Sequence, residues 1–218
     1  MQTKMKIHVS VEGNISAGKS NFCNKLKEYF ESKILPVEVA PEPIEQWVAW
    51  PTASGPVNLL QKQYEDPSKN AVHFQLAALV SKCEQLNSYA ETESLITERS
   101  LESQRKVFIP LLKNSGYISD LDISILDRLF EQVCKSDAVK PDLYVYLKTS
   151  PAVALSRAEK RGRPEEKMVE LDLLNRLHEL HENWLERDET VPVLVVLADA
   201  EPPDPETVYS RIVNILKK

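Results

Sequence analysis

The chain lacks the features that mark secreted, membrane-spanning or zinc-bound proteins. Its three cysteines, Cys23, Cys83 and Cys134, lie far apart and form neither a C-x-x-C pair nor a zinc-ligand spacing. No apolar run approaches the roughly 18 residues that a bilayer-spanning helix needs. Residues 1–6 are polar and lead directly into an expected strand, unlike a signal peptide. These absences predict reduced thiols, no membrane partner and a cytoplasmic location.

Positive charge is also scarce. Lys and Arg total 27 against 33 Asp and Glu, which gives a formal net charge of −6. A general grip on nucleic acid needs a surplus of cations, so we expect no nucleic-acid partner. A chain of 218 residues, 42% of them apolar, can bury a core without disulfides. No linker or repeat divides it, and we predict one domain over residues 1–218.

The spacing of apolar residues predicts strands that alternate with helices. Strands are expected at residues 6–12, 37–39, 95–97, 143–147 and 193–197. Helices are expected at residues 19–33, 71–91, 103–114, 121–136 and 170–188. Two more are expected, one that begins after Ser150 as its N-cap and one that begins at Asp204. Residues 47–56 are expected to be irregular. This order predicts an α/β fold with a five-stranded parallel sheet flanked by helices, and ligands beyond the carboxyl ends of the strands.

The loop after the first strand carries a phosphate-binding motif. The pattern G-x-x-x-x-G-K-[ST] is matched by Gly13, Asn14, Ile15, Ser16, Ala17, Gly18, Lys19 and Ser20. Backbone N–H groups of such a loop wrap a polyphosphate, at the positive end of the following helix. Lys19 is expected to reach the β- and γ-phosphates and the Ser20 hydroxyl to bind Mg²⁺. The strand–loop–helix context disfavours a chance glycine-rich turn, so the motif predicts a P-loop and a nucleoside triphosphate.

Charged residues stand at the ends of the other strands. Glu42 lies between two prolines after the second strand, and Glu98 and Arg99 end the third. An acid there can hold Mg²⁺ through water, and an arginine can bridge an acceptor oxygen and a transferring phosphoryl group. The alternatives are an exposed glutamate in a turn and a surface ion pair, which would contribute little. The N-K-x-D string of GTPases is absent.

A cluster of arginines follows the fourth strand, comprising Arg157, Arg161 and Arg163. A solvated charged helix face is the usual explanation of such a run. In an acidic chain, next to Gly162 and Pro164, a mobile lid that brings arginines onto phosphates is better supported. We place this lid at about residues 157–167.

At this point the chain resembles the deoxynucleoside kinase family, in the group of deoxycytidine, mitochondrial thymidine and insect deoxynucleoside kinases. The similar stretches follow the family's order and cover nearly the whole chain: EGNISAGKS (12–20), PEPIEQW (41–47), VNLLQKQYEDP (57–67), FQ (74–75), ERS (98–100), YLKTSP (146–151), RAEKRGRPEE (157–166) and LHELHENWL (177–185).

The resemblance implies a role for each matched residue. Glu42 matches the general base for the nucleoside 5′-hydroxyl, Arg99 its partner, and Glu98 the acid near Mg²⁺. Tyr64 and Glu166 match the pair that holds the sugar 3′-hydroxyl, and Gln75 matches the amide that pairs with the base. The surroundings of the nucleoside are implied to include Trp47, Leu60, Phe74, Ala78, Lys82, Gln104 and Phe108. Arg157, Arg161 and Arg163 match the lid, with ATP as donor and Mg²⁺ as cofactor. A glutamine offers a donor and an acceptor in one plane, which suits a pyrimidine edge.

Two positions depart from the pattern of these relatives. Lys82 stands where cytidine-preferring relatives have arginine, and Gln104 where they have aspartate. We expect a pyrimidine deoxynucleoside, with thymidine and deoxycytidine both open. The alternative interpretation of Lys82 is that its side chain points to solvent, as most lysines do. His178 and His181 are three apart rather than four, so helix packing is expected instead of a zinc site.

The expected reaction is transfer of the γ-phosphoryl group of ATP to the 5′-hydroxyl of a deoxynucleoside in nucleotide salvage. Two alternatives remain. One is a thymidylate-type nucleoside monophosphate kinase, whose acceptor phosphate Glu42 would repel. The other is a catalytically idle nucleotide-binding module. The resemblance also implies a homodimer, formed through helices at residues 70–92 and 121–136.

Overall fold

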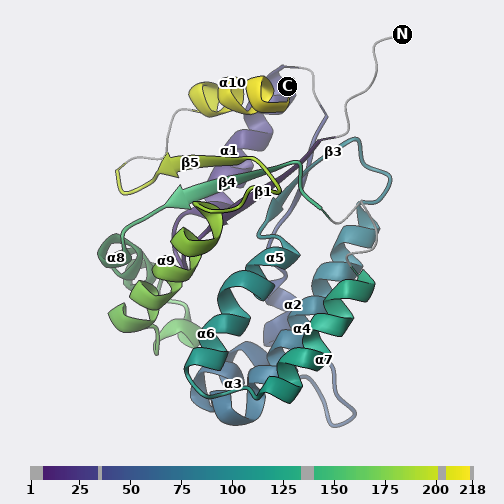
Figure 1. Cartoon of the computed structure of the whole chain (residues 1–218), viewed down its shortest axis with the longest axis vertical. Helices are drawn as coiled ribbons and strands as arrows, with labels where there is room; N and C mark the ends of the chain where they lie inside the picture. Colours follow the sequence, from purple (N-terminus) through teal and green to yellow (C-terminus); the bar gives the residue numbers. More distant parts are fainter. Residues whose placement is uncertain (1–6, 34–35, 134–139, 201–204, 217–218) are drawn as a thin grey trace.

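A sheet of five parallel strands forms the centre of the molecule (Figure 1). The computed structural model describes residues 7–33, 36–133, 140–200 and 205–216. The strands are β1 (Ile7–Gly13), β2 (Glu38–Ala40), β3 (Ser94–Glu98), β4 (Leu143–Lys148) and β5 (Val193–Leu197), in the order β2-β3-β1-β4-β5. The predicted α/β class and five-stranded parallel sheet are therefore confirmed. Residues 1–6, Cys134 and the end of the helix expected at 121–136 lie outside the described residues.

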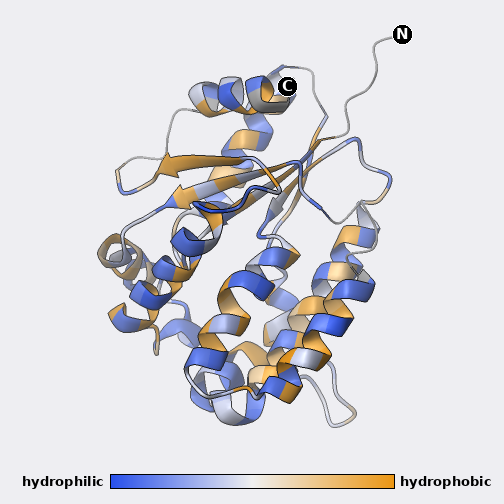
Figure 2. Ribbon diagram, viewed as in Figure 1, coloured by the Kyte–Doolittle hydropathy of each residue, from blue (hydrophilic) through white to orange (hydrophobic). Residues whose placement is uncertain are grey.

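Alternate residues of the central strands are buried against opposite layers of helices. Val9 and Val11 of β1 pack in one core with α1 (Lys19–Ser32) and α10 (Pro205–Leu216). Tyr144 and Tyr146 of β4 pack in another core with α9 (Leu171–Leu185) on the other face. Burial on both faces explains why β4 reads as a continuous apolar run, whereas β5, at the edge of the sheet, leaves Val195 and Leu197 exposed. Figure 2 shows this as strands that are largely apolar between helices with one polar face.

The remaining helices lie mostly on the face of the sheet opposite α1 and α10 (Figure 1). They are α2 (Ile44–Val48), α3 (Leu59–Glu65), α4 (Pro67–Ser88), α5 (Leu101–Ser103), the π-helical η1 (Gln104–Phe108), α6 (Ile109–Asn114), α7 (Asp120–Val133), α8 (Pro151–Arg161) and the 3₁₀-helical η3 (Pro164–Glu166). The expectation of irregular structure at 47–56 was wrong at its start, where α2 runs to Val48, and α3 was not predicted. No helix in the described part of the chain is long and apolar enough to cross a bilayer.

The helix expected at residues 103–114 is divided by a π-helical turn. The Ile109 N–H donates to the Gln104 carbonyl five residues earlier, which is the π-helical spacing. Pro110, at the start of α6, has no N–H, and its ring excludes an α-helical bond to residue 106. The wider turn accommodates the proline and places Gln104 and Phe108 along the same cavity.

Candidate active site

A cavity of about 800 Å³ lies beyond the carboxyl ends of β1, β2 and β3. The cavity is bordered by residues of the phosphate loop and of the chain at the ends of β2 and β3, among them Lys19, Ser20, Glu42 and Glu98. Every residue expected around a nucleoside borders the same cavity: Trp47, Leu60, Tyr64, Phe74, Gln75, Ala78, Lys82, Arg99, Gln104, Phe108 and Glu166. The structure thus brings together side chains spread over more than half of the sequence.

The phosphate loop connects β1 to α1 in a conformation that requires its glycines. Gly13 has φ +145°, and a Cβ there would lie 2.8 Å from the Leu147 carbonyl oxygen. Gly18 has φ +93° and immediately precedes α1. Asn14 fastens the loop to α9, because its Nδ2 donates to the Leu174 carbonyl over 2.8 Å. The buried Ser16 Oγ has no hydrogen-bond partner in the described structure and borders the cavity. The loop is therefore rigidly held, with a polar group free for a ligand.

Lys19 and Ser20 both meet Glu98 at the end of β3. Lys19 Nζ donates to the Asn14 carbonyl over 2.9 Å and lies 3.9 Å from Glu98 Oε1. Burial lowers the pKa of Lys19 to about 8, aided by the Arg99 charge and opposed by that of Glu98. The Ser20 hydroxyl donates to Glu98 Oε2 over 2.9 Å. One hydroxyl and one carboxylate make a donor set that fits Mg²⁺, which keeps most of its waters.

Arg99 occupies the centre of the site and has an unusual backbone. Its φ is +63°, in the left-handed region that non-glycine residues rarely adopt. Its Nε donates to Glu42 Oε1 over 3.1 Å, and its guanidinium carbon lies 4.8 Å from the centre of the Phe108 ring. Its Nη1 lies 3.4 Å from His181 Nε2. The predicted pairing of Arg99 with the carboxylate of Glu42 is present in the structure.

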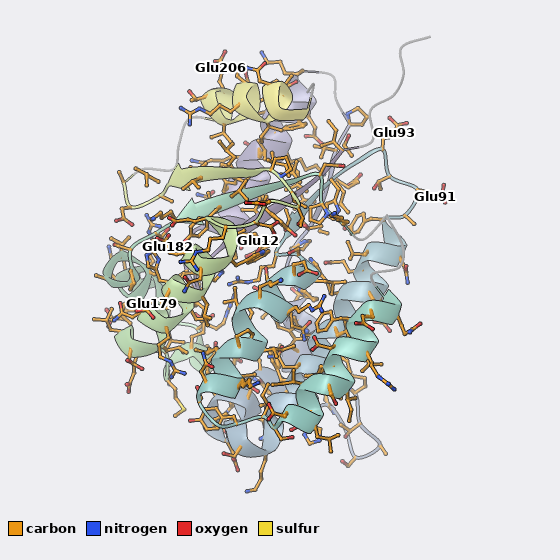
Figure 3. All side chains as sticks on the ribbon, in the orientation of Figure 1. Glu12, Glu91, Glu93, Glu179, Glu182 and Glu206 are labelled. Carbon is orange, nitrogen blue, oxygen red and sulfur yellow. The ribbon has the colours of Figure 1, made fainter. Side chains whose placement is uncertain are left out.

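The buried carboxylate of Glu12 holds the turn that follows Arg99. Its Oε1 accepts from the Ser100 N–H over 2.9 Å and from the Ser10 hydroxyl over 2.8 Å. Its Oε2 accepts from the Ser103 hydroxyl. Figure 3 shows Glu12 near the centre of the molecule, whereas Glu91, Glu93 and Glu206 lie at its periphery. Glu12 therefore connects the strand of the phosphate loop to the segment that carries Arg99, and it compensates for the backbone strain there.

A flat polar and aromatic surface forms the other end of the cavity. Gln75 is buried on α4, and its Oε1 has no hydrogen-bond partner among the described residues. Gln104 donates its Nε2 to the Gln75 backbone carbonyl, so its own Oε1 is the atom left for a ligand. Trp47 is anchored by a 2.9 Å bond to Ser81 and meets the Phe74 ring edge-on at 5.2 Å. An unpaired amide oxygen in a cavity that aromatic side chains also border is an arrangement that suits a planar heterocycle.

The alternative that Lys82 points to solvent was wrong. The side chain is buried, and its Nζ donates to the Glu98 carbonyl and to Gln85 Oε1, each over 3.1 Å. Burial lowers the pKa of Lys82 to about 8, while nearby carboxylates, that of Glu42 foremost, oppose the shift. The hydrogen bonds offset part of the cost of burying an ammonium group, which explains why the lysine can face the cavity.

The comparison with known proteins agrees with this geometry. The sequence profile described as "Deoxynucleoside kinase" matches residues 9–218. The chain belongs to the deoxynucleoside kinase family. The predictions of the family and of a kinase are confirmed.

Several curated members of the family are similar over most of this chain. A fowlpox virus protein named "Probable deoxycytidine kinase" is 36% identical over 98% of this chain and 87% of its own length. Human mitochondrial thymidine kinase 2 is 32% identical over 91% and 73%, respectively. Human deoxycytidine kinase is 33% identical over 81% and 74%. Because these names specify two different bases, they leave the base preference of this member to its own pocket.

The three arginines of the segment predicted to be a lid have different partners in this deoxynucleoside kinase. Arg161 and Arg163 border the cavity, and both form ion pairs with Glu166 of η3. Arg157 does not border it; its guanidinium donates to carbonyls of Ala17 and of residues 198–200. Arg157 therefore links the phosphate loop to the segment after β5. Arg161, one helical turn further along α8, borders the cavity instead. Gly162, with φ +66°, ends α8, and its left-handed backbone lets the chain turn between Arg161 and Arg163.

Tyr64 lies beside this lid. Burial raises the pKa of its phenol, and the charges of Glu166 and Glu42 raise it further. The neutral phenol can therefore donate a hydrogen bond into the cavity at any physiological pH. Glu165 of the lid accepts from Asn58, the N-cap of α3, over 2.8 Å. The helix that carries Tyr64 is thus joined directly to the lid.

Two residues of the site were not assigned there from sequence. Glu12 was only part of the first strand, and His181 was expected to serve in helix packing. In the described part of the chain no group of three or more His, Cys, Asp or Glu side chains could hold a metal ion. His181 nevertheless contacts Arg99, which lies 82 positions away. The position of Glu12 at the end of the first strand, directly before the phosphate loop, offered a signal, since a charged residue inside a buried strand needs partners.

Proposed function

We propose that this protein transfers the γ-phosphoryl group of ATP to the 5′-hydroxyl of a pyrimidine deoxynucleoside. The observation that carries the proposal is one cavity bordered by the phosphate loop, the Glu42–Arg99 pair and the unpaired amide oxygen of Gln75. A P-loop alone accounts for a triphosphate. The paired carboxylate and the amide-lined pocket account for an alcohol acceptor that carries a heterocycle.

Glu42 is the base in this proposal. Its Oε1 is engaged by Arg99, while its Oε2 accepts no hydrogen bond from the described part of the chain. The 5′-hydroxyl proton passes to this carboxylate as the bond between O5′ and the γ-phosphorus forms. The bond from that phosphorus to the β–γ bridging oxygen breaks, and ADP leaves. A carboxylate is a weak base toward an alcohol, so we expect the proton to move late.

Cations surround the transferring group. Lys19 and Arg99 reach the transferring group from the carboxyl ends of β1 and β3. Arg161 and Arg163 reach it from the lid once they exchange Glu166 for phosphate oxygens. Such groups stabilise the charge on the equatorial oxygens in the transition state. Ser20 and Glu98 would hold Mg²⁺, which supplies additional positive charge at the phosphates when it is bound. Glu166, once released, and Tyr64 provide an acceptor and a donor for the sugar 3′-hydroxyl.

The base pocket offers groups that suit both pyrimidines. The Gln104 Oε1 can accept from the 4-amino group of cytosine. Lys82 bonds two acceptors in the structure and retains a third N–H, which can donate to the 4-carbonyl of thymine. Gln75 can pair with either base after rotation of its amide. We therefore propose that thymidine and deoxycytidine are both substrates.

An ADP-release assay tests the proposal. Purified protein with ATP and Mg²⁺ is supplied with each of the four deoxynucleosides and, separately, with thymidine monophosphate. Release that depends on thymidine or deoxycytidine is expected. Release with the monophosphate alone would identify a nucleoside monophosphate kinase, and ATP binding without acceptor-dependent release would identify an idle module. Replacement of ATP by other nucleoside triphosphates in the same assay establishes the preferred donor.

We further propose that the enzyme is a homodimer assembled through α4 and α7, which lie side by side (Figure 1). Leu121, Ile125 and Leu129 form a stripe on α7 with exposed fractions of 68%, 51% and 38%, and Val80 of α4 is 45% exposed. An apolar stripe of this kind is typical of an interface. Sedimentation should show a dimer that Ile125→Arg converts to monomer and that Glu131→Arg, an exposed position of α7 outside this stripe, leaves intact. A monomeric wild-type protein would contradict the proposal.

A further inference from the structure

His181 is a buried histidine that faces the site without entering it. Its side chain lies in α9 with an exposed fraction of 0%, and it does not border the cavity. Its Nδ1 lies 2.7 Å from the Leu177 carbonyl, which can only accept a hydrogen bond, so Nδ1 carries the proton. The neutral ring then presents the lone pair of Nε2 to Arg99 Nη1, 3.4 Å away. The tautomer is thus fixed by the helix backbone.

Two anchors are needed to fix a guanidinium group. The bond from Arg99 Nε to Glu42 Oε1 fixes one edge, and the face of Phe108 fixes the plane loosely. A bond at Nη1, on a different nitrogen, prevents the group from turning about the first bond. Glu42 is also the group that gains a proton in the proposed reaction, which weakens its hold on Arg99 during turnover. His181 undergoes no such change and is therefore the constant anchor.

We propose that His181 is a positioning residue that orients the Arg99 guanidinium for phosphoryl transfer. The inference rests on the proposed function, since it assigns His181 a role through Arg99 in that reaction.

The surroundings of the ring support this assignment over packing alone. The His181 ring is parallel to that of Tyr146, with centroids 6.0 Å apart, and this contact accounts for its burial. It does not account for a lone pair directed at a cation. Burial, and secondly the positive charge of Arg99, hold the pKa of His181 well below its usual range, so the ring remains a neutral acceptor. A phenylalanine would satisfy the packing, whereas only an acceptor satisfies Arg99.

Two amide substitutions separate these roles. In His181→Asn the short amide can replace Nδ1 and bond the Leu177 carbonyl, but it cannot reach Arg99. In His181→Gln the longer amide can place its oxygen where Nε2 stands. We expect His181→Asn to lower kcat by on the order of 10-fold to 100-fold, as for a misplaced reacting group. We expect His181→Gln to keep kcat within about 5-fold of wild type, the equivalent of one ordinary hydrogen bond.

The KM for ATP should be nearly unchanged in both variants, because the hydrogen-bonding contacts of His181 in the described structure are with Leu177 and Arg99 and not with Lys19 or the phosphate loop. His178→Asn is the matched control, since His178 lies one turn earlier on α9 and its closest charged partner is Glu182 at 3.9 Å. It should retain wild-type kcat. Melting curves of all three variants identify any that has merely lost stability.

A double-mutant cycle with Arg99→Lys decides whether His181 acts through Arg99. If it does, His181→Asn costs little further activity once the guanidinium is gone. An equal loss of kcat in both backgrounds would overturn the proposal, as would wild-type kcat in His181→Asn. If the wild-type protein phosphorylates no deoxynucleoside, the proposed function fails instead, so the two failures are distinguishable.

Discussion

Glu42 and Arg99 stand two residues beyond a pair of directly facing residues in neighbouring strands. Ala40 of β2 and Thr97 of β3 are opposite each other in the parallel register, and the chain then runs on to Glu42 and Arg99. This common offset brings carboxylate and guanidinium to a 3.1 Å contact at the edge of the sheet. The pairing is thus a consequence of strand register, supported by the left-handed backbone at Arg99.

Replacement of the base by its amide should separate chemistry from binding. Glu42→Gln keeps the shape of the side chain and an oxygen for Arg99, but the amide cannot take the 5′-hydroxyl proton. We expect ATP affinity to persist and kcat to fall by roughly 10²-fold or more. Steady-state kinetics together with ATP titration of the free enzyme measure both quantities. Full turnover in this variant would refute the role of Glu42.

The lowered pKa of Lys19 predicts how the use of ATP depends on pH. In the free enzyme this pKa is about 8, so the ammonium loses its proton above that pH and the attraction for phosphates weakens. With nucleoside saturating, kcat/KM for ATP should therefore fall above about pH 8. Bound phosphates raise the pKa of the lysine again, so kcat at saturating ATP should fall only at higher pH.

A comparison with Lys19→Arg identifies the titrating group. Arginine does not deprotonate in the accessible range, so this variant should show lower activity but no decline of kcat/KM for ATP near pH 8. If the decline persists in the arginine variant, another group is responsible. Keeping the nucleoside saturating is essential, because Lys82 has a similarly lowered pKa.

The parallel sheet, the phosphate loop and the position of Glu42 after the second strand were predictable because local patterns specify them. Contiguous apolar strands imply a parallel sheet, and parallel strands bring their carboxyl ends together. The π-helical turn at Gln104–Phe108 was less accessible, although Pro110 signals a break. The short helix α3 is stabilised by its cap at Asn58 and by packing on α4 rather than by its own pattern.

The supports of Arg99 could not be predicted from sequence. Helical periodicity shows that His181 is buried but not that it meets Arg99 from another element. The carboxylate of Glu12 finds its partners at Ser100 and Ser103, which lie in the chain segment after a different strand. Such contacts depend on the three-dimensional register of β1 and β3. The bonding of Lys82 was hidden for the same reason, since its acceptor is a backbone carbonyl.

The choice of base should respond in opposite directions to two substitutions. Lys82→Met removes the donor proposed for the thymine 4-carbonyl, so kcat/KM for thymidine should fall more than that for deoxycytidine. Gln104→Met removes the acceptor proposed for the cytosine amino group, so the reverse is expected. Each change should shift the ratio of the two kcat/KM values by about 5-fold to 10-fold, the effect of one hydrogen bond. Competition between the two nucleosides measures the ratio directly, and shifts of the same sign in both variants would contradict the assignment.

The buried ammonium of Lys82 predicts a pH-dependent stability. Its pKa is about 8 in the folded protein and near 10.5 when the lysine is unfolded, so the unfolded chain binds more protons between these values. Its unfavourable contribution is therefore fully present below about pH 8 and is relieved as the pH rises toward 10.5. The free energy of unfolding of Lys82→Met, relative to that of wild type, should be highest near pH 7. This difference in stability should shrink by on the order of 2 kcal/mol by about pH 9.5. Lys19 is common to both proteins and cancels in the difference. Urea unfolding at the two pH values measures the change, and a difference that is independent of pH would show that Lys82 is not buried as an ammonium group.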